Sequence, residues 1–383
     1  MEKHNPKRFY HNLGIILTAV LLCVLVINLA LPKKSFSEKE NRVLASFPSF
    51  SMSGFTGGRL ETQIEDYAND HFMLRDLWVS FRSNFNRLLG KSEQNGVYLG
   101  KDGYLLESFA MPDDSFTAGV SDALSAFAMG HSSLNMYMLL APTSVNILKD
   151  HLPAFAPEAD QDHYIDTIRT NVTNAGMRFV DVRDTFRSRP DEQLYYRTDH
   201  HWTTLGAYYA YNLLAQEMQF DASLVTYEKL PASTRFQGTL AAKSGFRQNL
   251  YDELDVFLPA DATSYEYVVT YVDDRKKVAS FYASEKLATR DKYAMFFDGN
   301  HAQVRIYTPE ADDRTLLVIK DSYANSLVPF LSPNYRNIIM IDPRYYYGAL
   351  DDLIAADEVD DVLFLYNAKT FFSDNSLELL LAP

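Results

Sequence analysis

The chain has 383 residues, 47% of them hydrophobic and 14% aromatic, which is enough to bury a core in one large domain or two modest ones. This composition excludes a disordered chain. The formal net charge is −14, from 50 acidic and 36 basic residues, so the chain lacks the basic footprint of a nucleic-acid-binding protein. The single cysteine, Cys23, excludes a disulfide framework and leaves the cellular compartment to be inferred from other features.

The N-terminus carries an apolar segment with the length of a membrane anchor. Lys7 and Arg8 precede a run from Leu13 to Leu31, and two lysines follow it. A bilayer is crossed by about 20 apolar residues, whereas a signal-peptide core has roughly 7–15, so the length favours a retained single-pass helix over a cleaved signal. We expect residues 1–34 to form a cytoplasmic tail and anchor, with the rest of the chain outside the cytoplasm. Asn28 is expected to contact another membrane helix or to reach the polar boundary.

Residues 35–94 are predicted to form a linker and one long helix that packs on the following domain. The linker, Ser35 to Phe55, is rich in Ser, Phe and charge and has no clear period. From Gly57 to Gly90, apolar residues recur at the three- and four-residue spacing of an amphipathic helix. The members of this stripe are Leu60, Ile64, Tyr67, Phe72, Leu74, Leu77, Trp78, Phe81, Phe85 and Leu88.

Residues 95–383 are predicted to form one α/β domain. A β-hairpin over residues 96–107 opens it, and helices are expected over residues 115–129, 164–175 and 203–218. Strands and helices alternate, which indicates a parallel sheet flanked by helices. The runs that suit strands buried on both faces are Leu134–Ala141, Phe179–Val182, Thr315–Lys320, Asn337–Ile341 and Asp361–Tyr366.

Two segments of this domain depart from the alternation. Tyr227–Tyr251 has no period, and we interpret it as an irregular active-site loop because structureless segments over about 15 residues in compact domains tend to be functional. Residues 255–310 contain short alternating stretches such as Ser264–Tyr271 and Ala294–Phe297. These stretches predict an inserted β segment whose antiparallel strands lie within or beside the α/β core.

The densest group of reactive side chains is Asp199, His200, His201 and Trp202, directly before the expected helix over 203–218. In an extended segment, residues two apart lie on the same side, so Asp199 and His201 can converge while His200 points away. An Asp that orients a His is the arrangement that activates a serine nucleophile. For each residue alone, a helix cap or a structural hydrogen bond is the alternative.

Ser322 is the candidate nucleophile. The strand over 315–320 runs into Asp321 and Ser322, and a helical segment over 323–328 follows. This puts Ser322 at the carboxyl edge of the sheet, where α/β proteins build their sites. Free backbone N–H groups at the start of a helix can donate to a developing oxyanion. The alternative is that Ser322 only caps this helix, so the assignment depends on His201 as the base that removes its proton.

Five further residues are oxyanion or substrate candidates, and each has a structural alternative. Tyr323 and Gly238 can offer backbone N–H groups, although Gly238 can instead serve a tight turn with positive φ. Asn367 follows a strand and can donate from its side chain or simply form a turn. Arg197 can bind a substrate carboxylate or make a surface ion pair. Trp202 can stack on a sugar or pack against the following helix.

A metal site is the rival interpretation of the group around His201, because zinc and manganese accept Asp and His ligands. No second cluster of His or Cys in the sequence supplies a matching half-site, so we predict no metal and no cofactor. The Asp-His-His phosphoesterases also have upstream Asp-x-Asp motifs. The one such triplet before residue 199, Asp160–Asp162, lies in a loop rich in Pro and Ala.

The sequence resembles the DHHW protein family over nearly the whole chain. The signature Asp199-His-His-Trp202 is complete, and the other similar motifs are Ser37-Glu38-x-Glu40-Asn41-Arg42, Asn95–Gly100, Phe236-x-Gly238-Thr239 and Lys320-Asp-Ser-Tyr323. These proteins are similar to the SGNH-like domains of bacterial alginate O-acetylation proteins, in which an Asp-x-His pair precedes the nucleophilic Ser. The resemblance implies an SGNH-hydrolase-like fold with permuted motif order and a triad of Asp199, His201 and Ser322. Lys320 stands where the common Gly-Asp-Ser block has Gly.

The resemblance also implies a role. It points to an O-acyltransferase, with acetyl as the expected group, that works beside a multi-pass membrane-bound O-acyltransferase on a secreted or cell-wall polysaccharide. An acyl-Ser intermediate can pass its acyl group to a sugar hydroxyl or to water, so an esterase or deacetylase of the same fold is one alternative. The other is a non-catalytic glycan-binding or scaffold subunit in which Ser322 is only a cap.

Overall fold

The structure is a computed structural model that describes residues 6–34, 36–37, 42–246, 249–261, 266–309 and 311–382. The chain divides into two compact units, Met1–Lys91 with Gly245–Arg247 and Ser92–Ser244 with Gln248–Pro383. Several residues named above lie outside the described residues, namely Ser35, Glu38, Glu40, Asn41 and Ser264.

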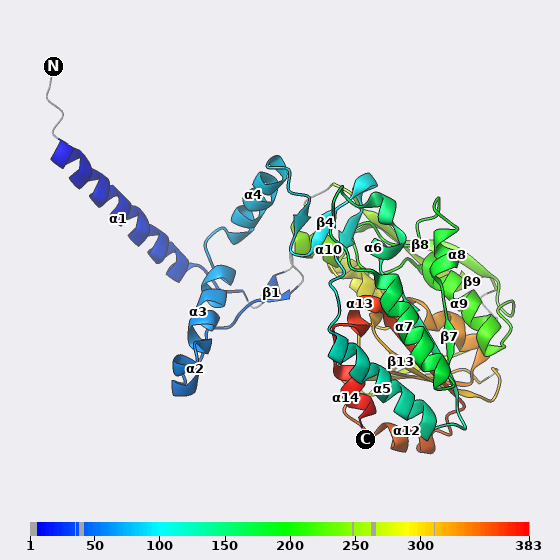
Figure 1. The fold of residues 1–383 in the computed structure, drawn as a ribbon. Coiled ribbons are helices and arrows are strands. Elements are labelled where there is room, and N and C mark those ends of the chain that lie inside the picture. Colours follow the sequence, from blue (N-terminus) through cyan, green and yellow to red (C-terminus); the bar gives the residue numbers. More distant parts are fainter. Residues whose placement is uncertain are drawn as a thin grey trace. The chain divides into compact units, whose positions relative to one another are not determined.

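The first unit is mainly helical (Figure 1). Its elements are α1 (Pro6–Ala30), β1 (Phe36–Ser37), β2 (Arg42–Val43), α2 (Met52–Thr56), α3 (Arg59–Asp70) and α4 (Arg75–Leu88), and β1 and β2 pair antiparallel. Within the described part of the chain, one segment is long and apolar enough to cross a membrane by length and composition, the 20 residues Phe9–Asn28 of α1.

The single long helix predicted up to Gly90 is wrong, because the chain breaks between α3 and α4. Leu74 adopts a left-handed conformation with φ of 55°, which no helix interior accommodates. The end of α3 is held by the linker, since the carboxylate of Asp70 accepts the Ala45 N–H at 2.8 Å and the His71 ring contacts the Ala45 carbonyl at 2.9 Å. The apolar period continues across the break, so the sequence pattern alone does not reveal it.

The second unit is built on an eight-stranded sheet in the order β11-β10-β12-β14-β13-β15-β6-β7. The five strands from β14 to β7 are parallel, as predicted, and β12, β10 and β11 extend the sheet as an antiparallel edge. The strands are β6 (Asn135–Ala141), β7 (Arg178–Val180), β10 (Val268–Tyr271), β11 (Lys276–Val278), β12 (Gln303–Tyr307), β13 (Thr315–Lys320), β14 (Asn337–Ile341) and β15 (Asp361–Asn367).

Helices cover both faces of this sheet and give it two cores. Successive residues of β13 point to opposite faces, so Leu316 and Val318 join one core while Leu317 and Ile319 join the other. The first core contains residues of α9 (Thr204–Met218) and α11 (Val328–Leu331). The second contains residues of α5 (Asp114–Gly130), α7 (Gln161–Asn174), α12 (Leu350–Ala356), α13 (Ala368–Phe371) and α14 (Ser376–Leu381).

Smaller elements complete the unit. The predicted hairpin is confirmed, with β4 (Val97–Leu99) and β5 (Leu105–Glu107) antiparallel, and β3 (Glu93–Gln94) pairs with β4. The short helices α6 (Ser144–Ile147) and α8 (Arg183–Arg187) follow β6 and β7. A single-turn 3₁₀ helix, η5 (Ser322–Ser326), and α11 follow β13 in place of the continuous helical segment predicted over 323–328.

Residues 227–251 are not the irregular loop that the sequence predicted. β8 (Tyr227–Phe236) pairs antiparallel with β9 (Asp252–Pro259), and α10 (Thr239–Ser244) lies between them. β8 is mostly exposed and contains two register shifts, so it lacks the alternating pattern by which a strand is recognised. The strand predicted at Ala294–Phe297 is also wrong, because this stretch contains a 3₁₀ turn, η4 (Lys292–Met295).

The two-core arrangement predicts a large effect for a truncation in β13. Leu317 is fully buried, and replacing a core Leu by Ala costs roughly 2–5 kcal/mol because apolar contacts are lost and a cavity remains. We expect Leu317→Ala to lower the free energy of unfolding of the purified full-length protein in detergent by about 3 kcal/mol. Leu379→Ala on α14 is the control, since Leu379 is 66% exposed and its loss should cost under about 0.5 kcal/mol. Equal losses in the two variants would contradict the assigned core.

Candidate active site

The segment from Tyr195 to Trp202 forms a closed loop whose two ends pair in an isolated antiparallel bridge. The buried carboxylate of Asp252, on β9, binds this loop through hydrogen bonds. It accepts the backbone N–H of Arg197 at 3.0 Å, that of Thr198 at 2.8 Å, and the Thr198 hydroxyl at 2.6 Å. The loop is therefore fixed by a strand that the sequence did not predict.

A chain of hydrogen bonds joins this loop to the end of β13. His201 Nε2 lies 2.8 Å from Ser322 Oγ, and His201 Nδ1 lies 2.6 Å from Asp199 Oδ1. Both distances are within the reach of a hydrogen bond, although 121 residues separate His201 from Ser322 in the sequence. Asp199 and His201 are 1% and 4% exposed, so the bond between them forms away from bulk water, whereas Ser322 is half-buried.

Asp199 has a full set of donors. Its Oδ1 also accepts the His201 N–H at 3.0 Å, and its Oδ2 accepts the N–H and the hydroxyl of Thr239 at 2.7 and 3.0 Å. Burial alone would raise the pKa of Asp199, but the adjacent imidazoles and these hydrogen bonds outweigh burial and hold it well below the usual range. The carboxylate is therefore ionised and acts only as an acceptor, which puts the proton of the His201 ring on Nδ1.

His201 is correspondingly a neutral base. Burial lowers its pKa to about 4, and the neighbouring His200 adds to this effect while Asp199 opposes it. The ring of Tyr293 stacks on the imidazole, with 3.7 Å between centroids and 10° between planes. With the proton on Nδ1, the lone pair of Nε2 faces the hydroxyl of Ser322 and can take its proton.

His200 does not point away from this group. Its ring centroid lies 3.8 Å from that of His201, and its Nδ1 contacts the Thr239 hydroxyl at 2.6 Å. The expectation failed because it assumed an extended segment, whereas residues 197–201 form successive bends. Asp199 and His201 converge through an Asx-type turn, in which the carboxylate accepts the N–H two residues later.

The ligand-type atoms of Asp199, His200 and His201 lie within 4.8 Å of one another, which is the spacing of a metal site. Each of these side chains has another partner, however. The two nitrogens of His201 contact Asp199 and Ser322, and Thr239 donates to Asp199 and contacts His200. The geometry thus suits proton transfer through His201.

The predicted oxyanion donors differ in availability. The Tyr323 N–H donates to Asp321 Oδ1 at 2.9 Å, and the Gly238 N–H donates to Thr198 Oγ1 at 3.1 Å. Within the described part of the chain, the side-chain nitrogen of Asn367 is buried without a partner, and the Ser322 N–H has no protein acceptor. At the ends of β13 and β15, the donors without a partner among the described residues are therefore the backbone N–H of Ser322 and the side chain of Asn367.

Gly238 serves neither as a free oxyanion donor nor as a turn residue with positive φ, the two roles predicted for it. Its φ is not in the left-handed region, and a Cβ built on it would lie 2.1 Å from Asp199 Oδ2. The absent side chain leaves the space that the Asp199 carboxylate occupies. Gly is required here for close approach.

Trp202 is packed inside the domain, as its structural alternative held, whereas Arg197 lacks, among the described residues, the surface ion pair that was its structural alternative. Trp202 is fully buried, and its Nε1–H points to the Tyr323 carbonyl at 3.1 Å and the Ser326 hydroxyl at 3.0 Å, so it links the loop to η5 and offers no face to a sugar. The Arg197 guanidinium lies 5.7 Å from the ring centroid of Tyr104, and no ion pair involving it occurs among the described residues.

Lys320, which replaces the expected Gly, is buried at the end of β13. Its Nζ donates to Asn325 Oδ1 at 2.9 Å and lies 3.8 Å from Asp342 Oδ2, beyond the end of β14. Burial lowers the pKa of Lys320 to about 8, while Asp342 opposes the effect. The side chain thus ends in a polar cluster with Asn325 and Asp342.

Thr239, Asp252 and Tyr293 were missed by the sequence analysis, although each contacts the loop or its histidines. Phe236-x-Gly238-Thr239 was recognised as a motif, but no local pattern connects these residues to residue 199.

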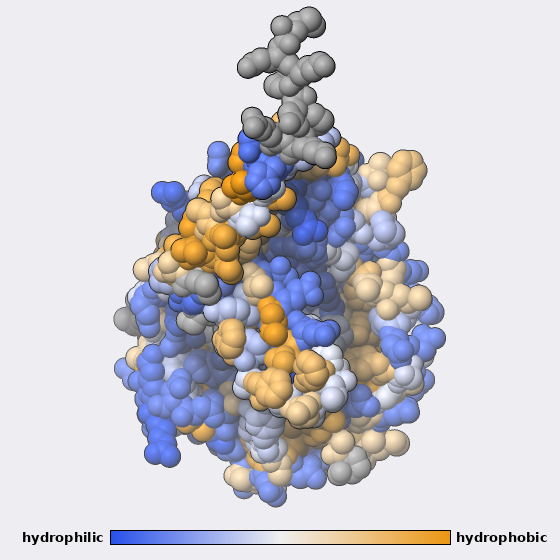
Figure 2. All heavy atoms as spheres, turned by 90° about the vertical axis from the view of Figure 1, so that its left-hand side faces the viewer, coloured by the Kyte–Doolittle hydropathy of each residue, from blue (hydrophilic) through white to orange (hydrophobic). Residues whose placement is uncertain are grey.

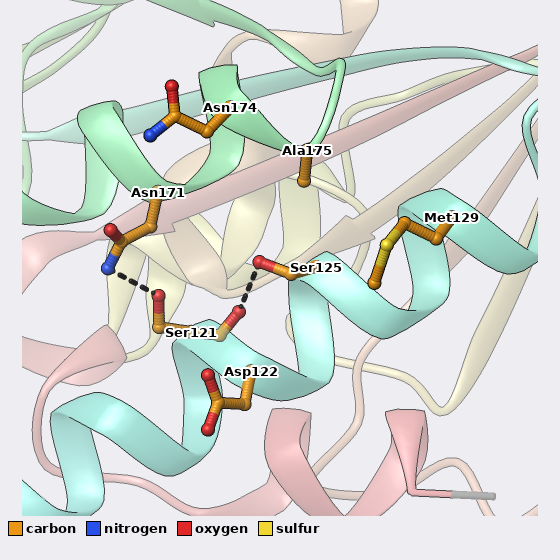
Figure 3. Close-up of a pocket in the computed structure, with 7 residues that line it drawn as sticks. All are labelled: Ser121, Asp122, Ser125, Met129, Asn171, Asn174 and Ala175. Atoms are coloured by element: carbon orange, nitrogen blue, oxygen red, sulfur yellow. Dashed lines mark hydrogen bonds between the residues drawn. The ribbon is translucent and has the colours of Figure 1, made fainter.

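A hollow of about 330 Å³ lies between α5 and α7, and none of the candidate active-site residues lines it (Figure 3). It is lined by Ser121, Asp122, Ser125, Met129, Asn171, Asn174 and Ala175.

Comparison with known proteins now places the chain. The model of the DHHW protein family matches residues 84–341, more than half of the sequence. The chain belongs to the DHHW family. A solved structure of a DHHW family protein from Eubacterium siraeum has a TM-score of 0.62 at 25% identity, covering 75% of this chain and 95% of that chain.

Two further relatives are more distant. Bacillus cereus PatB1, solved with a sulfonyl adduct, has a TM-score of 0.60 at 18% identity and covers 73% of this chain and 96% of that chain. The protein named "Probable alginate O-acetylase AlgJ" of Pseudomonas aeruginosa is 23% identical over 173 residues, which is 43% of this chain and 44% of that relative. The match therefore spans less than half the length of the relative.

The similarity to the two solved structures confirms the predicted SGNH-hydrolase-like α/β fold.

The close approach at Gly238 predicts a sensitive position. We expect Gly238→Ala to displace the Asp199 carboxylate, to slow sulfonylation of Ser322 by phenylmethylsulfonyl fluoride at least about tenfold, and to destabilise the fold by roughly 1–3 kcal/mol. Intact-mass spectrometry and thermal unfolding measure the two effects. Gly130→Ala at the end of α5 is the control, because nothing lies within 4 Å of its added Cβ. Unchanged sulfonylation in Gly238→Ala would contradict this account of Asp199.

The pKa of His201 predicts how Ser322 reactivity depends on pH. A base with a pKa of about 4 remains unprotonated well below the ordinary value for His, so the sulfonylation rate should stay level from pH 8 to about 5 and fall to half near pH 4. The unfolded chain binds this proton near pH 6.5, so stability also declines as pH falls from about 6.5 to 4, and thermal unfolding is followed in parallel. A midpoint near 6.5 in folded protein would contradict a buried neutral His201.

Proposed function

We propose that this protein is a membrane-anchored, extracytoplasmic O-acyltransferase, acting with acetyl as the acyl group on a secreted or cell-wall polysaccharide. The observation that carries the proposal is the hydrogen-bonded chain from Asp199 through His201 to Ser322. It contains an ionised orienting carboxylate, a neutral imidazole and a serine hydroxyl, which are the parts that acyl transfer through an ester intermediate requires.

In the first half-reaction, Ser322 Oγ attacks the carbonyl carbon of an acyl donor. His201 Nε2 takes the hydroxyl proton, and Asp199 stabilises the imidazolium that forms. The Ser322 N–H and Asn367 Nδ2 are the donors available to the developing oxyanion. The tetrahedral intermediate then collapses, the leaving group takes the proton from His201, and an acyl ester remains on Ser322.

In the second half-reaction, a sugar hydroxyl attacks that ester. His201 removes the proton of the hydroxyl, the acyl group passes to the sugar oxygen, and Ser322 Oγ recovers the proton from His201. Water in place of the sugar would complete hydrolysis with the same residues, so the triad alone does not distinguish a transferase from an esterase. The similarity to a protein named as an alginate O-acetylase favours transfer.

We also propose that the reaction takes place outside the cytoplasm, at the membrane surface. The apolar segment Phe9–Asn28 supports a single-pass anchor with the remainder of the chain outside the cytoplasm. An acyl donor outside the cytoplasm must be supplied across the membrane. We therefore propose a multi-pass membrane-bound O-acyltransferase as the partner.

Replacement of the nucleophile tests the proposal in cells. We expect Ser322→Ala to reduce the O-acetyl content of the surface polysaccharide to the level of a gene deletion, because no acyl ester can form. Ser223→Ala, at an exposed serine, is the control. Acetate released by alkali is measured at equal protein abundance. Acetylation that survives in Ser322→Ala would instead favour a non-catalytic scaffold.

Transfer and hydrolysis are separated with purified full-length protein in detergent. Acetate release from a chromogenic acetyl ester is measured with and without added oligosaccharide. A transferase should form acetylated oligosaccharide, detected by mass spectrometry, at the expense of free acetate. Release of free acetate alone, with no acetylated sugar over a panel of acceptors, would favour the esterase.

A further inference from the structure

Helix α4 carries an apolar face that the proposed reaction does not use. The face is built from Leu74, which precedes the helix, and from residues three or four apart along it, and each member is between 49% and 85% exposed. Its members are Leu74, Leu77, Trp78, Phe81, Phe85 and Leu88. Figure 2 shows apolar residues, coloured orange, at the surface of the face that it presents. An exposed apolar stripe of this kind marks an interaction surface.

The start of α4 is attached to the end of the membrane-length segment. Asn28, the last residue of Phe9–Asn28, accepts the backbone N–H of Met73 on its Oδ1 at 2.7 Å. Met73 lies in the turn between α3 and α4. The polar side chain of Asn28 therefore contacts this chain's own α3–α4 turn, and α4 begins where α1 would leave a bilayer.

The charge of α4 matches a membrane surface. Arg82 and Arg87 are exposed, and neither has an acidic partner among the residues that the structure describes. Three arginines and one aspartate make this helix basic in a chain whose net charge is −14. Basic residues combined with exposed Trp and Phe are typical of helices that lie in the headgroup region of a bilayer.

We propose that α4 is an interfacial helix that lies on the same membrane that α1 spans. Its apolar face inserts at the boundary between headgroups and acyl chains, and its arginines contact the phosphates of anionic lipids. This inference rests on the anchoring role proposed for α1, because the bond from Met73 to Asn28 relates α4 to the membrane boundary. The chain is then held by a spanning helix and by a second helix in the surface.

The natural tryptophans provide the test. The chain has two, Trp78 on the apolar face and Trp202, which is fully buried in the α/β domain. Full-length protein is reconstituted in liposomes of phosphatidylcholine and phosphatidylglycerol with brominated acyl chains. We expect bromolipids to reduce Trp78 emission at least about twofold, as for an interfacial residue, and iodide to have little effect. In Trp78→Phe, the remaining Trp202 emission should not respond to bromolipids.

A pair of adjacent substitutions tests the face itself. Phe85→Glu inserts a charge into the apolar stripe, whereas Asn86→Glu adds the same charge about 100° around the helix. We expect Phe85→Glu to abolish most of the bromolipid quenching of Trp78 and Asn86→Glu to leave it unchanged. Equal quenching in both variants would contradict a face that inserts into lipid.

Three other outcomes would also overturn the inference. Trp78 that iodide quenches and bromolipids do not would mean that the face is open to water. Trp78 protected from both quenchers, increasingly so at higher protein density in the liposomes, would mean that a second copy covers it. Extraction of the protein by alkaline carbonate would mean that α1 is not an anchor, a failure of the proposed anchoring that is distinct from a failure of α4 alone.

Discussion

The buried carboxylate of Asp199 is the interaction on which the rest of the site depends. An anion that is 1% exposed is stable only if its oxygens receive enough hydrogen bonds, and here they come from two distant segments. The His201 ring and backbone donate from the loop, and Thr239 donates from the start of α10. Gly238 leaves the room for this arrangement, because any side chain there would overlap the carboxylate.

The sheet supplies the other half of the site through a second buried carboxylate. Asp321 follows β13, and its two oxygens accept the N–H of Tyr323 at 2.9 Å and the N–H of Asn367, at the end of β15, at 2.9 Å. It therefore ties together the ends of two neighbouring parallel strands. This fixes Ser322 beside Asn367, whose side-chain nitrogen has no partner in the described part of the chain.

Trp202 connects these two halves. Its indole N–H donates to η5, which begins at Ser322, so the loop that carries the histidine is bonded directly to the turn that carries the serine. The signature Asp-His-His-Trp thus combines, within four residues, the carboxylate and the imidazole of the proposed triad and a structural link. Its second His packs on His201 and contacts Thr239, and its proximity adds to the lowering of the pKa of His201 that burial causes.

The sequence by itself determined the parallel strands, because a run such as Thr315–Lys320 is apolar at every position but its ends and can only be buried on both faces. It also indicated that Asp199, His201 and Ser322 belong together, since a Ser needs a base and Asp199 lies two residues before His201, where it can orient the ring. It did not determine β8, whose exposed residues carry no periodicity and which becomes recognisable as a strand through its pairing with β9.

Only the tertiary structure decided what each candidate donor does. Whether the N–H of Gly238 or Tyr323 is free depends on Thr198 and Asp321, and no local pattern reports such contacts. The same is true of the break before α4, where the apolar period continues but Asp70 and His71 bind the linker. The spacing of apolar residues shows which face of an element is apolar. Hydrogen bonds and close approaches form between segments that are far apart in the sequence, so no local pattern predicts them.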